Sequence, residues 1–181
     1  MENIRKSFLW AVAILFFASF SASQLSAREP SPRVQSKLAE KVRRELVMLP
    51  FFGVFDNLAF RVNGYHVTLW GQVTRPALKS GAEAVVKRIE GVEKVTNRIE
   101  VLPLSPHDDR IRRAAYRAIY GHTALNRYSL GANPPIRIIV RNGHVTLEGV
   151  VANSMDRNMA GIQANGVPGV FPVTNRLRVE T

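Results

Sequence analysis

The chain of 181 residues contains no cysteine. This absence excludes a disulfide scaffold, a thiol nucleophile and lipid attachment through cysteine. Acidic residues are also scarce, with 14 Asp and Glu against 25 Lys and Arg, so the formal net charge is +11. A charge this high favours acidic partners such as anionic lipid, nucleic acid or acidic glycan, but it does not indicate a fold. Hydrophobic residues make up 46% of the chain, which predicts packed cores rather than disorder.

Motifs that carry catalytic, nucleotide or metal chemistry are missing as well. No glycine run precedes a helix in a phosphate-binding pattern, and no serine stands in a sharp-turn nucleophile motif. His66 and His144 have no histidine or carboxylate at ligand spacing, and His107 and His122 fall in a linker and a loop. We therefore expect a non-enzymatic protein with no catalytic residues, no metal site and no cofactor.

Residues 1–27 have the layout of a secretory signal peptide. Arg5 and Lys6 form a short basic region, an apolar run follows at 8–20, and small residues follow at 21–27. The apolar run is shorter than the roughly 20 residues that a membrane-spanning helix needs. We expect this segment to direct export, and an uncleaved N-terminal anchor is the alternative.

The rest of the chain contains an internal repeat. Shifting the sequence by 78 residues pairs 66–101 with 144–179 without a gap, and 14 of 36 positions are identical. The shared residues include "HVTL", "GV" and "VTNR". A long period that occurs only twice indicates two copies of a small domain rather than a solenoid. We expect a first domain at 34–102 and a second at 106–180.

Each copy predicts the element order α-β-β-α-β. Val34, Leu38, Val42 and Leu46 recur at a spacing of four, which predicts an amphipathic helix, and Asp108 or Asp109 is a candidate cap for the equivalent helix of the second copy. Alternating strands flank an Asn-Gly turn in both copies. Tyr65 is expected to lengthen the first turn as a bulged loop. The expected elements are helices at 33–49, 76–89, 108–120 and 154–166, and strands at 57–62, 66–73, 95–101, 135–141, 144–151 and 173–179.

The predicted fold class is therefore α+β, with two tandem α-β-β-α-β modules. Each module has a three-stranded sheet with two helices on one face, so the other face of each sheet is open. These patterns resemble the BON domain family of exported bacterial proteins, on the residues "V.NG.VTL.G.V" and "GV..V.N.L.V" in both copies. The resemblance covers essentially all of 34–180.

The resemblance implies a binding protein of the bacterial periplasm and cell envelope, without lipoprotein attachment because cysteine is absent. It implies anionic phospholipid as the ligand class and a role in envelope integrity and osmotic stress. In one relative the later helix of the second module meets the membrane with aromatic and apolar residues. The matching stretch here, 154–166, offers Met155, Met159 and Ile162 but no Trp or Phe.

Strand alternation places four arginines on the open face of the second sheet, namely Arg137, Arg141, Arg176 and Arg178. We call this set the arginine face. Arginine forks suit phosphate groups, so the arginine face is the predicted phospholipid-binding site. The alternative is a solvated basic face that Glu148 partly neutralises.

Alternation also sends Trp70 outward on the first sheet, where the other module, a second chain or a membrane interface could cover it. Phe51 and Phe52 lie in a phenylalanine-rich loop at 50–60 and are either core residues or an exposed apolar tip. Trp70, Phe51 and Phe52 are the predicted interaction residues.

The leading hypothesis is thus a non-enzymatic envelope protein that binds anionic phospholipid membranes. The alternative is a protein-interaction or scaffold module that docks to peptidoglycan or to other envelope proteins. Nucleic acid is not an expected partner, because export argues against it and the outward faces lack interleaved aromatics. The sequence leaves the oligomeric state open.

Overall fold

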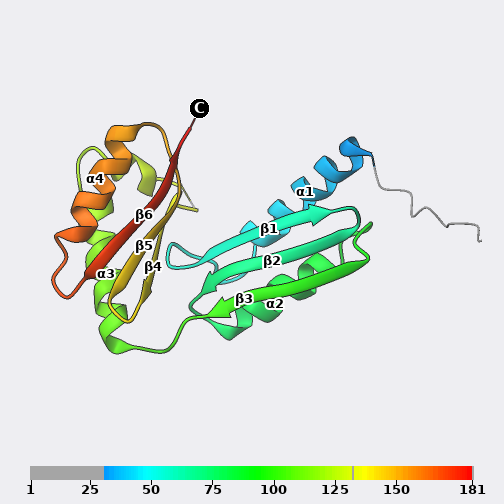
Figure 1. Cartoon of the computed structure of the whole chain (residues 1–181), viewed down its shortest axis with the longest axis horizontal. Coiled ribbons are helices and arrows are strands. Elements are labelled where there is room, and N and C mark those ends of the chain that lie inside the picture. Colours follow the sequence, from blue (N-terminus) through cyan, green and yellow to red (C-terminus); the bar gives the residue numbers. More distant parts are fainter. Residues whose placement is uncertain (1–30, 132, 181) are drawn as a thin grey trace, which may run out of the picture.

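The computed structural model describes residues 31–131 and 133–180, so the predicted signal peptide at 1–27 lies outside the described residues. The described chain forms two modules, each in the order α-β-β-α-β (Figure 1). The first module contains α1 (Pro32–Val47), β1 (Asn57–Asn63), β2 (His66–Val73), α2 (Pro76–Lys87) and β3 (Lys94–Val101). The second contains α3 (Pro106–Tyr120), a 3-10 helix η1 (Asn126–Ser129), β4 (Ile136–Arg141), β5 (His144–Val151), α4 (Ser154–Asn165) and β6 (Phe171–Val179).

Both sheets have the same topology. β1 and β2 pair antiparallel, β2 and β3 pair parallel, and β4, β5 and β6 repeat this arrangement. Figure 1 shows α3 and α4 together on one side of the second sheet, while the first module lies on the other side. The predicted fold class is confirmed.

Each module has its own core. Val42, Leu69 and Val86 are fully buried in the first, and Ala115, Ile138 and Leu147 are fully buried in the second. Leu38, Val42 and Leu46 form the buried stripe of α1, as the spacing predicts. Val34 does not continue this stripe, because 44% of its surface is exposed in the first turn of the helix.

The hairpin turns differ from the prediction. Asn63 pairs with His66 and Arg141 pairs with His144, so both turns contain two residues and Tyr65 does not lengthen the first one. In the second module Asn142 and Gly143 both have positive φ, the pattern of a type I′ turn. In the first module only Gly64 does, at the first turn position, the pattern of a type II′ turn. The Asn-Gly pair is therefore displaced by one position between the copies.

The helix cap of the second module also corrects an expectation. Ser105 caps α3, because its hydroxyl accepts a hydrogen bond from the Asp108 amide at 3.2 Å. Asp108 is fully buried instead, and its carboxylate accepts hydrogen bonds from the amides of Asn142 and Gly143, both at 2.9 Å. Asp108 thus holds the β4–β5 turn against α3.

The repeated "VTNR" has a structural explanation. The side-chain oxygen of Asn97 accepts from the amide of Ile99, and its amide group donates to the Lys79 carbonyl at 2.9 Å. Asn175 makes the same two kinds of bond, to Leu177 and to the Arg157 carbonyl. In both modules this asparagine ties the last strand to the preceding helix.

The glycine in the middle of β2 and of β5 is required by a close approach of the neighbouring strand. Gly71 and Gly149 have φ of +122° and +124°. A Cβ at Gly149 would lie 1.8 Å from the carbonyl oxygen of Pro135, and one at Gly71 would lie 2.0 Å from that of Asn57. No side chain fits at either position without moving the neighbouring strand.

We expect Gly149→Ala to lower the free energy of unfolding by about 3 kcal/mol, because it combines an unfavourable φ with a backbone clash. Gly166→Ala is the matched control in the same module, since a Cβ there would make only ordinary contacts, the nearest at 3.7 Å. Chemical denaturation measures both. Equal stability of the two variants would contradict this explanation of the shared glycine.

Candidate functional site

The loop between α1 and β1 joins the two modules. The carbonyl of Val54 accepts a hydrogen bond from the amide of Ile138 on β4 at 2.9 Å. Val54 and Phe55 pack against the core of the second module, whereas Phe52 packs against the core of the first. The phenylalanine-rich loop therefore contributes to both cores.

The outer edge of β4 is closed by three groups, two from α3 and one from the loop between α1 and β1. The hydroxyl of Tyr120 donates to the Ile136 carbonyl at 2.6 Å, and Nη2 of Arg112 donates to the Val140 carbonyl at 2.8 Å. Between them the Ile138 amide donates to the first module. Burial raises the pKa of the Tyr120 phenol, so this group stays a hydrogen-bond donor. An edge that could otherwise pair with another strand is thus occupied.

Two residues of the arginine face contact the first module. Arg137 donates to the Gly53 carbonyl at 2.9 Å and lies over the ring of Phe52, 4.6 Å from its centroid. Burial lowers the pKa of Arg137, although Tyr120 and Asp56 oppose the shift. Arg141 forms an ion pair with Glu100 of β3.

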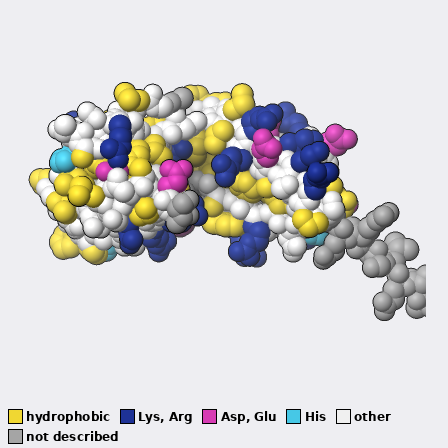
Figure 2. Space-filling view, turned by 90° about the horizontal axis from the view of Figure 1, so that it is seen from above, with side chains coloured by type: hydrophobic (Ala, Val, Ile, Leu, Met, Phe, Trp, Pro, Cys, Tyr) yellow, Lys and Arg dark blue, Asp and Glu magenta, His cyan; other side chains and the backbone are white. Residues whose placement is uncertain are grey.

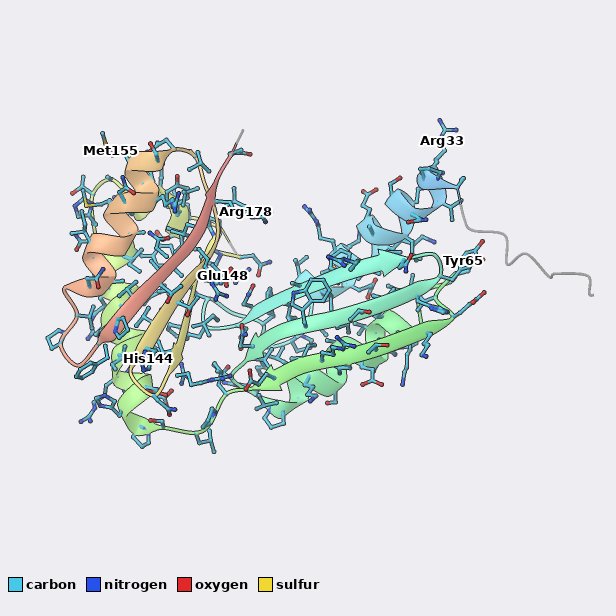
Figure 3. All side chains as sticks on the ribbon, in the orientation of Figure 1. Arg33, Tyr65, His144, Glu148, Met155 and Arg178 are labelled. Carbon is cyan, nitrogen blue, oxygen red and sulfur yellow. The ribbon has the colours of Figure 1, made fainter. Side chains whose placement is uncertain are left out.

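The other two residues of the arginine face remain more exposed. Arg176 pairs with Glu148 at 3.4 Å, and Arg178 has no ion-pair partner among the described residues. Figure 3 shows Glu148 and Arg178 on the side of the second sheet that faces the first module. A cleft of about 260 Å³ opens on this face, lined by Gln72, Ile139, Arg141, His144, Glu148 and Arg176. The arginines share one face as predicted, but three of the four have partners within the chain.

The predicted interaction residues lie in different environments. Trp70 is 37% exposed on the open face of the first sheet, and the guanidinium of Arg61 lies 6.0 Å from its ring centroid. Phe51 is 69% exposed, and Arg75 lies over its ring at 4.8 Å. Phe52 is partly buried between the first core and Arg137. The three residues therefore do not form one surface.

Sequence reasoning missed a basic stripe on α3. Arg110, Arg113 and Arg117 are exposed, and their spacing of three and four residues places them on one side of the helix. None of them has an ion-pair partner among the described residues, whereas the neighbouring Arg112 pairs with Asp109. We call the three residues the α3 stripe. The spacing was present in the sequence and could have revealed it.

An apolar groove lies beside the α3 stripe where the two modules meet. Its volume is about 400 Å³, and it is lined by Val54, Phe55, Tyr116 and Pro134, with Arg113 and Arg117 also lining it. Tyr116 contacts the ring of Phe55 edge-on, with centroids 6.3 Å apart. We call this feature the seam groove. It combines an apolar floor with cationic sides.

A second, more polar pocket adjoins the seam groove, since Phe55 and Arg113 line both. This junction pocket has a volume of about 320 Å³, and its other lining residues include Thr74, Arg75, Leu104, Asp109 and Arg112. Only 6% of the Arg112 side chain is exposed, and its Nε has no hydrogen-bond partner among the described residues. A buried donor left unpaired costs about 1–3 kcal/mol.

The family model for the BON domain matches residues 35–103 and 122–181. The chain belongs to the BON domain family. The first stretch covers nearly all of the first module, and the second covers the second module after α3, so the recognition made from the repeated residues is confirmed. No curated protein matches the chain.

Two solved structures resemble the BON modules weakly. One is CdsD, described as a structural protein of the type III secretion system of Chlamydia trachomatis, with 12% identity, a TM-score of 0.32, and coverage of 80% of this chain and 92% of that one. The other is the C-terminal domain of CdsD, with 13% identity, a TM-score of 0.29, and coverage of 81% and 99%. TM-scores this low support no inference about this BON protein.

Among the residues that the structure describes, no helix is long and apolar enough to cross a membrane. The same residues contain no group of three or more His, Asp or Glu that could hold a metal ion.

We expect Arg137→Ala to lower the free energy of unfolding by about 2 kcal/mol, because it removes a charged hydrogen bond between the BON modules and leaves the Gly53 carbonyl without this donor. Arg178→Ala is the matched control on the same face and should change stability by less than about 0.5 kcal/mol. Thermal unfolding measures both variants. If Arg178→Ala destabilised the protein as much, the hydrogen bond from Arg137 to the Gly53 carbonyl would not be what stabilises this face.

Proposed function

We propose that this BON protein is a non-enzymatic binding protein of the bacterial envelope and that it attaches to anionic phospholipid membranes through the α3 stripe and the seam groove. It is exported to the periplasm, where this attachment supports membrane integrity under stress. The observation that carries the proposal is the combination of unpaired arginines with an apolar groove at one place on the surface.

The α3 stripe suits a membrane surface for two reasons. Its three arginines have no ion-pair partner within the part of the chain that the structure describes, so they remain available for lipid phosphates. Leu104, which is 94% exposed just before α3, and the apolar floor of the seam groove add surface that can enter the headgroup region. An amphipathic surface of this kind binds by apolar burial together with attraction to anionic lipid.

Other basic surfaces fit less well. Figure 2, seen from above, shows Lys and Arg gathered at the α1 end of the first module. In α1, however, Glu40 and Glu45 are interspersed among the cations, and Arg44 pairs with Glu40. On the arginine face, Arg176 pairs with Glu148 and Arg137 is occupied by the loop. These pairings reduce the charge that each surface offers to a membrane.

We expect Arg113→Gln/Arg117→Gln to lower partitioning onto phosphatidylglycerol vesicles roughly 30-fold, since each cation near an anionic surface contributes about 1 kcal/mol. Liposome flotation measures this, with phosphatidylcholine vesicles as the uncharged lipid control. Binding by the unchanged protein should also weaken as salt rises.

Two further double variants remove the same charge elsewhere. Lys41→Gln/Arg43→Gln changes α1, and Arg176→Gln/Arg178→Gln changes the arginine face. Because charges more than about 8–10 Å from the membrane are screened at physiological salt, both should retain binding to within about threefold. Loss only in Arg176→Gln/Arg178→Gln would place binding on the arginine face, and equal flotation with both lipids would reject phospholipid as the ligand.

The second candidate function is a protein-interaction module, and the exposure of Trp70 favours it. A tryptophan that is 37% exposed among polar residues of an open sheet is typical of an interaction surface. Trp70→Ala should then abolish capture of an envelope protein that persists after delipidation of the extract. Phe171→Ala, at an aromatic residue that is 73% exposed on β6, is the matched control.

A further inference from the structure

We infer that the junction pocket binds a phosphate group and that residues of both modules hold it. The phosphate could belong to a lipid headgroup or to a soluble compound. Only the lipid headgroup as its source rests on the proposed function.

The charge of the junction pocket favours an anion. Arg75, Arg112 and Arg113 line it, and Asp109 is the one acidic lining residue among the described ones. Asp109 is already paired with Arg112, so the pocket retains the charge of Arg75 and Arg113. Neither of these two has an ion-pair partner among the described residues, although Arg75 stacks on the ring of Phe51. Guanidinium groups recognise phosphate oxygens with paired hydrogen bonds.

The start of α2 adds to this charge. Thr74 and Arg75 line the pocket and immediately precede α2, a helix of 12 residues. No side chain caps this helix end, and its first turn contains no acidic residue. The positive end of the helix dipole therefore lies at the wall of the pocket, an arrangement that binds anions in many proteins. The buried Asp56 carboxylate accepts a hydrogen bond from the Thr74 amide at 2.7 Å and offsets part of this charge.

Arg112 supplies an independent observation. Its Nη1 and Nη2 are engaged by Asp109 and by the Val140 carbonyl, which fixes the orientation of the guanidinium. Its Nε is buried and has no partner within the described chain. An anion in the pocket would therefore lie beside an almost fully buried guanidinium that one carboxylate, Asp109, offsets. The volume of about 320 Å³ falls at the lower end of the range for small-molecule sites.

The test is a titration of the full chain with glycerol 3-phosphate and with inorganic phosphate, followed by calorimetry and by amide NMR. We expect saturable binding of both, with shifts at Thr74, Arg75 and Arg113, and no binding of glycerol. Arg75→Gln/Arg113→Gln should weaken binding at least about tenfold, because both unpaired forks are lost. Lys41→Gln/Arg43→Gln, which removes the same charge from α1, should bind like the unchanged protein.

Vesicle flotation of the same proteins distinguishes this inference from the proposed function. Binding of glycerol 3-phosphate together with anionic vesicles supports both, and binding of the soluble phosphate alone supports the pocket while rejecting the membrane role. No binding of either soluble phosphate, or equal weakening in the α1 control, would overturn the pocket even if flotation on anionic vesicles persisted.

Discussion

The hydrogen bond from the Ile138 amide to the Val54 carbonyl is the contact on which the arrangement of this protein depends. Ile138 lies on the outer edge of β4, whose neighbouring carbonyls accept from Tyr120 and Arg112 of the same module. The Ile138 amide between them donates to Val54 of the first module, so the edge of the second sheet is closed only when this loop is docked. Phe55 then reaches the second core, and Arg137 covers Phe52.

This docking explains why the candidate sites lie where the two modules meet. The seam groove takes Val54 and Phe55 from the first module and Tyr116 from the second. The junction pocket likewise combines Arg75 with Arg113. Neither module forms the seam groove or the junction pocket by itself. The residues that the two copies share therefore have a different role from the residues in which they differ. The shared glycine and asparagine build each module, and the unshared loop and helix residues build the surfaces proposed to bind.

The sequence predicted the fold well because its elements depend on local patterns. Alternation in "HVTL" and the spacing of Leu38, Val42 and Leu46 are sufficient to define strands and helices. Alternation also placed the arginine face correctly. It could not predict that Arg137 donates to the Gly53 carbonyl, because that partner is 84 residues away and belongs to a different module.

The errors have a similar origin. Aligning the Asn-Gly pair of the two copies predicts a longer first hairpin turn. Strand pairing instead gives both turns two residues, so the Asn-Gly pair lies one position earlier in the first turn than in the second. Asp108 or Asp109 was the expected helix cap, yet Ser105 caps α3, and Asp108 accepts hydrogen bonds from the amides of a turn more than 30 residues later. The spacing of Arg110, Arg113 and Arg117 could have been recognised in the sequence. Its importance for binding depends on the adjacent seam groove, which forms only when the loop with Val54 and Phe55 is docked.

Native-state amide hydrogen exchange at Ile138 tests most directly whether the first module completes the second. If the loop is docked as described, this edge amide should exchange as slowly as the amides of β5 in the same core, through global opening only. Fast exchange at Ile138 while β5 stays protected would show that the β4 edge is open in solution, and it would contradict the account of a binding surface built by both modules.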